Sequence, residues 1–229
     1  DRLIVEKDGA RLAEIECLHL DALLVFGNVQ FTTQALAELL EHGIEMALLS
    51  QDGRLKGQLT PPKARNVLLR MEQYQTYNDP ARRLAFARAV VAAKLANAAA
   101  VVSRHRANHP ADELARAQAD IESLSARAAS AASLEELLGV EGAAARAYFA
   151  AFAAMGGAAL GFRGRSSRPP RDPANALLSF GYTLLGNELL WLADAMGFDP
   201  HIGLYHSLDY GRPSLALDLL EQFRHPAID

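Results

Sequence analysis

Cysteine is almost missing from this sequence of 229 residues, and its single cysteine, Cys17, excludes an intramolecular disulfide. The chain does not open on a positively charged segment followed by an apolar run, so the sequence indicates no secretory signal. Both features favour a reducing compartment, and we expect a cytoplasmic protein. Asp1 and not Met stands first, which leaves room for a fused or further N-terminal part.

Long uninterrupted apolar runs are also missing. The most membrane-like stretch, residues 143–162, is mostly alanine and glycine, contains Arg146 and closely follows Glu141, so we expect a buried helix and no membrane span. No Gly-rich phosphate loop or dinucleotide-binding fingerprint occurs, which disfavours a nucleotide-dependent enzyme of small molecules. Hydrophobic residues make up 50% of the chain, enough for one large or two small domains.

The net charge of −4 gives no general argument for nucleic acid, but the basic residues are segregated into two stretches. Residues 61–106 carry nine basic side chains against two acids: Lys63, Arg65, Arg70, Arg82, Arg83, Arg88, Lys94, Arg104 and Arg106. Residues 163–171 carry four arginines and no acid: Arg163, Arg165, Arg168 and Arg171. Two such stretches on an acidic protein are typical of a localised binding surface for a polyanion such as nucleic acid. Solvated helix faces remain the alternative interpretation.

Residues 2–60 have the pattern of a β-rich module. Apolar and polar residues alternate on both sides of Asp8-Gly9, and Asp52-Gly53 separates two further strand-like segments, which is a strong hairpin signal. One helix is expected in this part, beginning at Thr32 or Thr33 and ending at Gly43.

Pro61-Pro62 ends the strand pattern, and the sequence then becomes alanine-rich at helical spacing. The sequence therefore predicts an α+β protein with a small β-rich N-terminal domain, residues 1–62, and a larger all-α domain, residues 63–229. Proline, glycine and capping residues place the expected helices at about 64–77, 80–105, 111–129, a short one after Ser133, then 141–155, 174–196 and one from Pro213.

The residues best suited to catalysis or metal binding lie in the stretch GLYHSLDYGRPSLALDLLEQFR, residues 203–224. Asp218 and Glu221 are three residues apart on the helix that Pro213 can open, and helical side chains lean toward the N-terminus, here toward the loop with His206. An imidazole and two carboxylates suit a divalent ion such as Mg²⁺ or Mn²⁺, which can polarise a phosphoryl group. Two solvated acids near a helix end are the plainer alternative.

Three stretches together resemble one family. They are VEGAAARAYF at 140–149, RPPRDPANALLSFGYTLL at 168–185 and the stretch at 203–224, and they are similar to the motifs of CRISPR-associated protein 1. The resemblance implies a small β domain and an α-helical catalytic domain, with Glu141, His206 and Glu221 as ligands of Mg²⁺ or Mn²⁺. Many members have Asp where this chain has Glu221, so Asp218 can share or support ligation and is counted with the catalytic residues.

The resemblance also implies a reaction and partners. The 3′-hydroxyl ends of a short protospacer fragment would attack phosphodiester bonds of a CRISPR repeat, by transesterification and without a covalent enzyme intermediate. The expected partners are this DNA, a second copy of the chain in a homodimer, a dimer of CRISPR-associated protein 2, and a second adaptation nuclease.

Phosphate contacts are expected from Arg212, in preference to an ion pair with Asp209, and from the four arginines of residues 163–171. Tyr148, Tyr182 and Trp191 are expected in the core.

Two other functions fit the same residues: a nuclease that only hydrolyses DNA, and a DNA-binding scaffold without catalysis. The first would give only shorter products, and the second would bind DNA without metal-dependent strand transfer.

Overall fold

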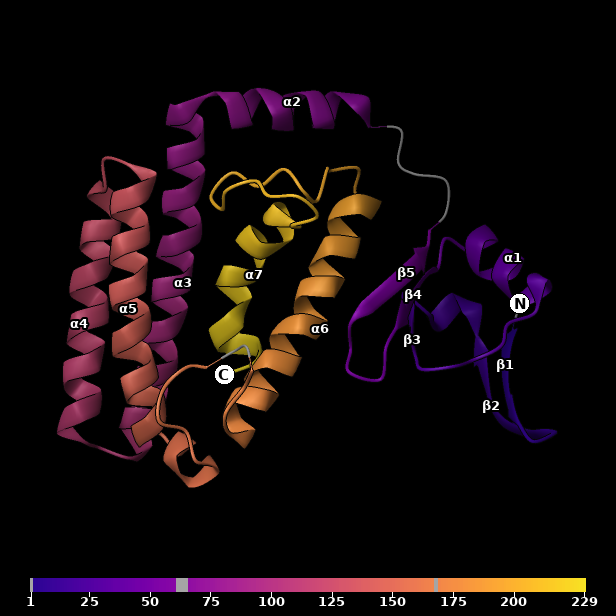
Figure 1. The fold of residues 1–229 in the computed structure, drawn as a ribbon, viewed down its shortest axis with the longest axis horizontal. Helices are drawn as coiled ribbons and strands as arrows, with labels where there is room; N and C mark the ends of the chain where they lie inside the picture. The colour runs from indigo at the N-terminus through magenta and orange to yellow at the C-terminus, as the bar shows by residue number, and fades with distance from the viewer. Residues whose placement is uncertain (1, 61–65, 167–168) are drawn as a thin grey trace. The chain divides into compact units, whose positions relative to one another are not determined.

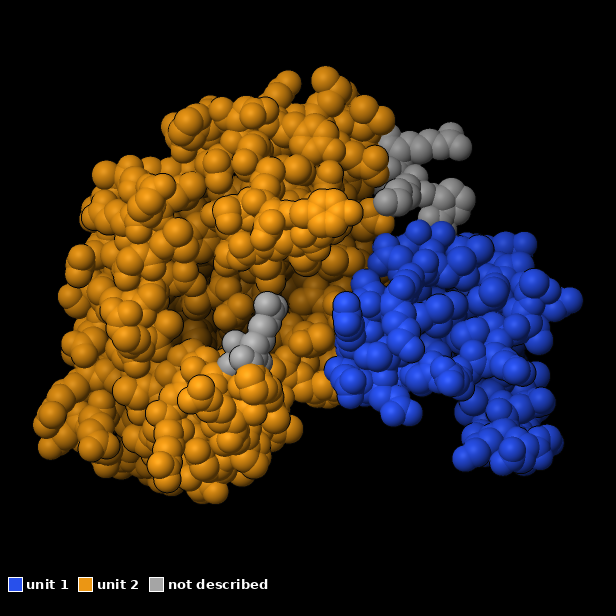
Figure 2. Space-filling view, in the orientation of Figure 1, with its two compact units in different colours: residues 1–65 blue, residues 66–229 orange. Residues whose placement is uncertain are grey.

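A computed structural model describes residues 2–60, 66–166 and 169–229 of the chain. These residues form two compact units, unit 1 (Asp1–Arg65) and unit 2 (Asn66–Asp229), coloured separately in Figure 2. Unit 1 holds the strands and unit 2 is helical, which confirms the predicted α+β class. The domain boundary expected at 62/63 lies outside the described residues and stays a prediction.

Unit 1 contains two small sheets in its described part. Strands β1 (Arg2–Lys7) and β2 (Ala10–Glu16) form an antiparallel hairpin. Its turn residues Asp8 and Gly9 both have positive φ, 52° and 77°, which is the geometry that matches the twist of a two-residue hairpin.

The second sheet has the order β3-β4-β5, with β3 (Ala22–Phe26) parallel to β4 (Glu45–Leu49) and β4 antiparallel to β5 (Leu55–Leu59). The parallel pair requires a crossover, and helix α1 (Thr33–Glu41) supplies it. Thr32 caps this helix by accepting a hydrogen bond from the Ala35 N–H at 3.1 Å. A short 3₁₀ helix, η1 (Cys17–His19), links β2 to the second sheet.

Unit 2 is built from six long helices in the described residues (Figure 1). They are α2 (Val67–Asn78), α3 (Pro80–Asn108), α4 (Asp112–Ser130), α5 (Leu134–Ala154), α6 (Pro173–Ala195) and α7 (Ser214–Ala227), with a short 3₁₀ helix, η2 (Gly157–Leu160), after α5. Helices α3, α4 and α5 pack side by side, and α7 packs against both α3 and α6.

The expectation of two helices between Ser133 and Met155 was wrong, because α5 is continuous from Leu134 to Ala154. Ser133 does cap it, accepting from the Glu136 N–H at 3.2 Å. No proline interrupts the stretch, and Leu137, Val140, Ala144, Tyr148 and Ala151 line one buried face along its whole length. Glu141 is therefore held in mid-helix, a more rigid position than a helix start.

Helices α3 and α5 are long and apolar enough to cross a membrane by length and composition alone. In this fold their apolar faces meet in the main core cluster of unit 2, with Val91, Leu95, Leu137 and Tyr148 among its fully buried members. Burial in this shared core accounts for part of their apolar composition, since 39% of the apolar window of α3 and 28% of that of α5 are buried.

The segment between α6 and α7 is anchored by the buried side chain of Gln73 on α2. Its amide nitrogen donates to the carbonyls of Asp199 and Ile202, at 2.8 and 2.9 Å, and its oxygen accepts from the Asp199 N–H at 2.9 Å. Gly203 follows directly, and a Cβ there would lie 2.6 Å from Ser214 Cβ and 2.7 Å from the Ser214 carbonyl carbon. The chain can pass the start of α7 only because residue 203 lacks a side chain.

We expect Gly203→Ala to destabilise unit 2 by about 1–3 kcal/mol, the usual range for overpacking, since the clash involves backbone atoms that cannot rotate away. Gly139→Ala is the matched control, because a Cβ at this helical glycine meets nothing within 4 Å, and it should stabilise by up to about 1 kcal/mol. Urea denaturation followed by fluorescence of Trp191, the single tryptophan, measures unit 2 specifically. Equal stability of the two variants would contradict the close approach at Gly203.

Candidate active site

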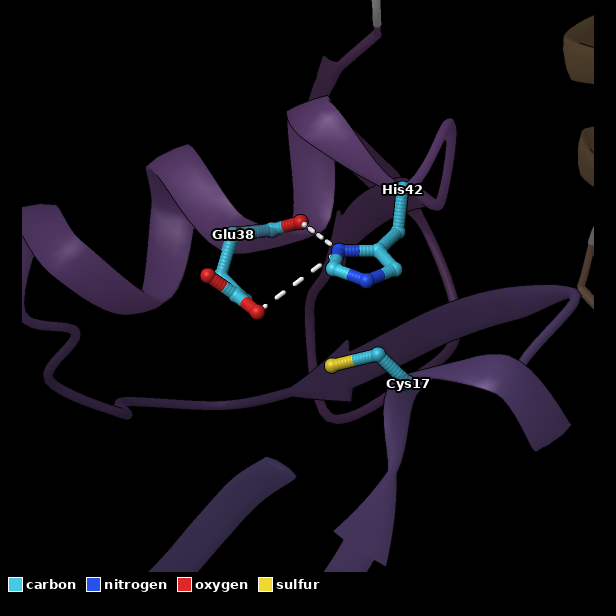
Figure 3. A group of neighbouring side chains, drawn as sticks. All are labelled: Cys17, Glu38 and His42. Atoms are coloured by element: carbon cyan, nitrogen blue, oxygen red, sulfur yellow. Dashed lines mark hydrogen bonds and ion pairs between the residues drawn. The ribbon is translucent and has the colours of Figure 1, made fainter. Parts of the chain in front are cut away.

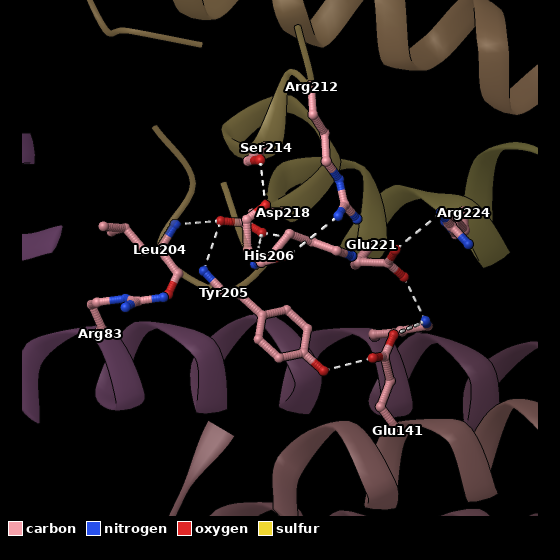
Figure 4. Close-up of polar contacts among 12 residues, drawn as sticks. Arg83, Glu141, Leu204, Tyr205, His206, Arg212, Ser214, Asp218, Glu221 and Arg224 are labelled. Carbon is pink, nitrogen blue, oxygen red and sulfur yellow. Dashed lines mark hydrogen bonds and ion pairs between the residues drawn. The ribbon is translucent and has the colours of Figure 1, made fainter. Parts of the chain in front are cut away.

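The carboxylate of Asp218 is fully buried on α7 and organises the loop that precedes this helix (Figure 4). Its Oδ2 accepts from the backbone N–H groups of Leu204 and Tyr205, at 2.6 and 2.9 Å, and its Oδ1 accepts from the N–H of His206 at 2.8 Å. Three successive N–H groups that surround one anion compensate its lost hydration. Asp218 is thus fully engaged by the loop.

The same carboxylate fixes the ring of His206. Asp218 Oδ1 lies 2.7 Å from His206 Nδ1, and since an ionised carboxylate only accepts, Nδ1 carries the hydrogen. The lone pair of a neutral His206 is then on Nε2, the usual arrangement when a carboxylate orients a metal-binding histidine. Of the two roles left open for Asp218, the geometry favours support of His206 over direct ligation.

Glu141 on α5 and Glu221 on α7 meet at the ammonium group of Lys94 on α3. Lys94 Nζ forms an ion pair with Glu141 Oε1 and lies 2.5 Å from Glu221 Oε2. The three side chains are only 7%, 13% and 3% exposed. The other oxygens are also held, Glu141 Oε2 by the Tyr205 hydroxyl at 2.6 Å and Glu221 Oε1 by Arg224 at 3.0 Å.

The charge of Lys94 decides the protonation of Glu141. Burial alone would raise the pKa of this carboxyl, but the Lys94 charge and the hydrogen bonds from Lys94 and Tyr205 together lower its pKa below the ordinary value of 4.5. Burial, followed by the nearby charge of Glu141, strongly raises the pKa of Tyr205. The site therefore combines an ionised carboxylate with a phenol that stays protonated.

The donor set fits a divalent cation. Glu141 and Glu221 already share one cationic group, and Glu221 Oε2 is a buried atom with no hydrogen bond among the described residues apart from this ion pair. His206 does not join them closely: in the described part of the chain, the one trio of His, Cys, Asp or Glu donors within 4.8 Å of one another lies in unit 1. Ligation by Glu141, His206 and Glu221 stays a prediction.

Most basic residues of the first stretch are used inside the chain. Arg70, Arg83 and Arg88 donate to backbone carbonyls of Gly197, Leu204 and Ala131, Arg82 pairs with Glu72, and Lys94 is buried between Glu141 and Glu221. Lys63 and Arg65 lie outside the described residues. This stretch therefore serves the fold more than it offers charge to a polyanion.

The described arginines of residues 163–171 are also of two kinds, exposed ones and one that is bonded inside the chain. Arg163 and Arg171 are exposed, whereas Arg165 is half-buried and donates to Asn175 Oδ1 at 2.8 Å and to the Ser179 hydroxyl at 3.1 Å. Arg168 lies outside the described residues. Asn175, fully buried, also accepts from the Ser166 N–H at 2.8 Å, so it fixes the positions of Arg165 and Ser166.

Arg212 is half-buried, and its guanidinium lies 3.4 Å from the Ser207 hydroxyl. The described residues show no ion pair between Arg212 and Asp209. Tyr148, Tyr182 and Trp191 are buried, as expected of core side chains.

Lys94, Tyr205 and Arg224 are site residues that the sequence did not single out. Lys94 is one of nine basic residues in its stretch, and it stands alone in the apolar run AVVAAKLANAAAVV. A single charge in the middle of a buried helix face is itself a signal, because an unpaired charge there would be too costly. Tyr205, next to His206, carries no comparable signal.

The whole chain is similar to known proteins. The family model described as CRISPR associated protein Cas1 matches residues 1–229. The chain is 40% identical, over 98% of its length, to a CRISPR-associated exonuclease Cas4/endonuclease Cas1 fusion of Geobacter sulfurreducens, of which it covers 42%. It is 35% identical, over 100% of its length, to CRISPR-associated endonuclease Cas1 2 of Rhodospirillum rubrum, of which it covers 69%.

Solved structures agree in fold. A Cas1 protein from Thermotoga maritima matches with a TM-score of 0.77 and 27% identity, over 98% of this chain and 70% of that one. A casposase bound to integration product matches with a TM-score of 0.75 and 28% identity, over 90% and 57%. A partial Cas6-RT-Cas1–Cas2 complex matches with a TM-score of 0.69 and 28% identity, over 98% and 68%. The chain thus spans less than half of the Geobacter protein and just over half of the casposase.

Lys94→Met tests the buried ion pair. In the metal-free protein we expect a loss of about 3–5 kcal/mol at neutral pH, because two buried carboxylates lose their shared counter-charge. The pH dependence should also change sign. In the wild type the lowered pKa of Glu141 gives stability that is present above 4.5 and is lost as the pH falls through the lowered value. In the variant burial raises that pKa, so stability should fall as the pH rises.

Urea denaturation followed by Trp191 fluorescence across the pH range measures both effects. Arg104→Met is the matched control, since Arg104 is exposed on the same helix, and it should change stability little. A Lys94→Met protein as stable as this control, with the wild-type pH dependence, would show that the ion pair does not carry this stability.

Proposed function

The chain belongs to the CRISPR-associated Cas1 family, and from that membership we propose that it is a metal-dependent DNA endonuclease and integrase of CRISPR adaptation. The 3′-hydroxyl ends of a short DNA fragment are joined into the CRISPR repeat by phosphodiester transesterification. One observation carries the proposal: two carboxylates from different helices, Glu141 and Glu221, converge on one buried cationic group. The casposase bound to integration product supports the integrase reaction by its likeness in fold.

Glu141, His206 and Glu221 are the proposed metal ligands. Mg²⁺ or Mn²⁺ held by these residues would stabilise charge on the phosphorus and lower the pKa of the attacking or leaving hydroxyl. Asp218 keeps the His206 proton on Nδ1 and leaves Nε2 as the donor atom. Tyr205 holds Glu141 Oε2 through a hydroxyl that stays protonated, which orients the carboxylate without adding a negative charge.

Lys94 keeps Glu141 ionised before a metal binds. Its ammonium lowers the pKa of this carboxyl, which burial alone would raise, and it also forms an ion pair with Glu221. A carboxylate must be ionised to bind a metal. In this proposal Lys94 therefore prepares the site, and it gives up at least one carboxylate when the divalent ion binds.

Binding of DNA is assigned to two exposed arginines and one half-buried arginine. Arg163 and Arg171 are exposed on either side of Arg165, and the half-buried Arg212 follows His206 in the loop before α7. Guanidinium groups suit phosphate oxygens because they donate in a planar fork. We leave Arg165 out of this set because its guanidinium donates to Asn175 and Ser179.

We also propose that the chain acts in the cytoplasm as a homodimer with a small partner of the Cas2 type. The structures named as Cas6-RT-Cas1–Cas2 complexes support the partner of the Cas2 type. The Geobacter relative named as a fusion with Cas4 supports a functional link to a second nuclease.

Glu141→Ala and His206→Ala should each reduce strand transfer at least about 100-fold, on the scale of lost transition-state stabilisation. The double variant should be no less active than either single one, because both changes remove the same metal site. Glu135→Ala, an exposed acid on the same helix, is the control and should retain activity. The assay joins a labelled short duplex to a repeat-bearing plasmid with Mg²⁺ or Mn²⁺ and the Cas2-type partner.

The products distinguish the proposed reaction from its alternatives. Branched products longer than the substrate indicate integration, only shorter products indicate hydrolysis, and binding without either indicates a scaffold. Full metal-dependent integration by the Glu141→Ala or the His206→Ala protein would refute the proposed ligands.

The double variant Arg163→Ala with Arg171→Ala should weaken DNA binding and make its salt dependence shallower. Each lost phosphate contact removes about 0.9 from the slope of log affinity against log salt, so the expected change is about 2. Arg116→Ala with Arg127→Ala on α4 is the control for a loss of two charges elsewhere on unit 2. Equal slopes for the loop variant and the wild type would remove this loop from the DNA interface.

A further inference from the structure

We propose that Cys17, Glu38 and His42 of unit 1 form a Zn²⁺ site (Figure 3). One donor atom from each of these three residues lies within 4.8 Å of the other two. The site is separate from the residues proposed to act on DNA, which all belong to unit 2, and it does not depend on the proposed function.

The fold brings the three donors together from two separate segments. Glu38 and His42 are four residues apart, so they lie on one face where α1 ends, and Cys17 begins η1 directly after β2. Cys17 is 2% exposed and belongs to the small core of unit 1, whereas the side chains of Glu38 and His42 are 33% and 26% exposed. The trio therefore extends from the core to the surface.

A backbone hydrogen bond prepares His42 as a ligand. His42 Nδ1 lies 2.9 Å from the carbonyl oxygen of Glu38, and because a carbonyl only accepts, Nδ1 carries the hydrogen in the neutral ring. The lone pair is then on Nε2, which Figure 3 shows on the side of the ring that faces Cys17. Donation from one ring nitrogen to a carbonyl is the usual support for a metal-binding histidine.

Sulfur, nitrogen and carboxylate oxygen are the donors that Zn²⁺ accepts in tetrahedral sites, at about 2.3, 2.0 and 2.1 Å. Donors bound at these distances are about 3.5 Å apart, so the donor atoms need to approach by at most about 1 Å. Glu38 Oε1 lies 3.7 Å from His42 Nδ1, so its carboxylate would turn toward the Nε2 side of the ring to share the ion. A thiolate ligand selects against Mg²⁺ and Mn²⁺, and the exposed side leaves a fourth position for water.

Zn²⁺ here would tie η1 to the end of α1. Unit 1 has few fully buried apolar side chains, and small domains with limited cores are often stabilised by a structural metal. Binding replaces the S–H bond of Cys17 by a sulfur–zinc bond and releases the proton to solvent. No oxidant or reductant is required.

The single thiol of the chain makes the proposal testable. The whole metal-free chain is titrated with Zn²⁺, and labelling of Cys17 by a thiol reagent is followed. At a Zn²⁺ concentration ten times the dissociation constant, labelling should slow about tenfold, because only the metal-free thiol reacts. Co²⁺ used as a spectroscopic probe should give a thiolate-to-metal absorption band in the near ultraviolet.

His42→Ala and Glu38→Gln should weaken this protection, and both change partly exposed side chains, so the fold should tolerate them. His19→Ala is the matched control, since His19 is a neighbouring histidine of η1 with a 75% exposed side chain, and it should keep full protection. The variant that lacks Glu141 and His206 should also keep it, which separates this site from the proposed catalytic one.

Protection of Cys17 that is unchanged in His42→Ala, or a Co²⁺ complex without the thiolate band, would overturn the proposal. Either outcome would mean that Cys17 only packs in the core of unit 1 and binds no metal. Loss of protection in the variant that lacks Glu141 and His206 would also overturn it, since the effect of Zn²⁺ would then come from unit 2.

Discussion

Buried negative charge is the constraint on which unit 2 depends. Three of the carboxylates in its interior belong to the candidate site, and each requires a compensating group because water is excluded. Asp218 receives three backbone N–H groups and His206, whereas Glu141 and Glu221 share Lys94. These contacts link α3, α5, α7 and the loop before α7. The fold and the candidate site are thus built from the same interactions.

The sequence predicted the architecture well wherever local signals decide the structure. The hairpin turns at Asp8-Gly9 and Asp52-Gly53, the cap at Thr32 and the helix stop at Gly43 all depend on neighbouring residues alone. Local signals failed at Gly142, where a new helix was expected. A glycine costs a helix only about 1 kcal/mol, and the buried face of α5 outweighs this cost.

The site was predictable in its residue types but not in its contacts. The spacing of Asp218 and Glu221 predicted that both lie on one side of α7. Only the tertiary structure shows that Asp218 contacts His206 and that Glu221 pairs with Lys94. The same limit applies to Arg165, whose charge resembled that of its exposed neighbours. Charge patterns do not reveal which arginine finds a partner such as Asn175 inside the protein.

Lys94 also bears on the proposed metal site, because its ammonium already neutralises part of the charge of Glu141 and Glu221. A divalent ion bound by these carboxylates would gain only the difference between its own attraction and that of the ammonium, less the cost of moving Lys94 to a new partner or toward water. In the proposed site this balance would favour a doubly charged ion with several ligand positions over a univalent ion. The lysine that stabilises the metal-free fold would thus set the minimum attraction that an incoming cation must exceed.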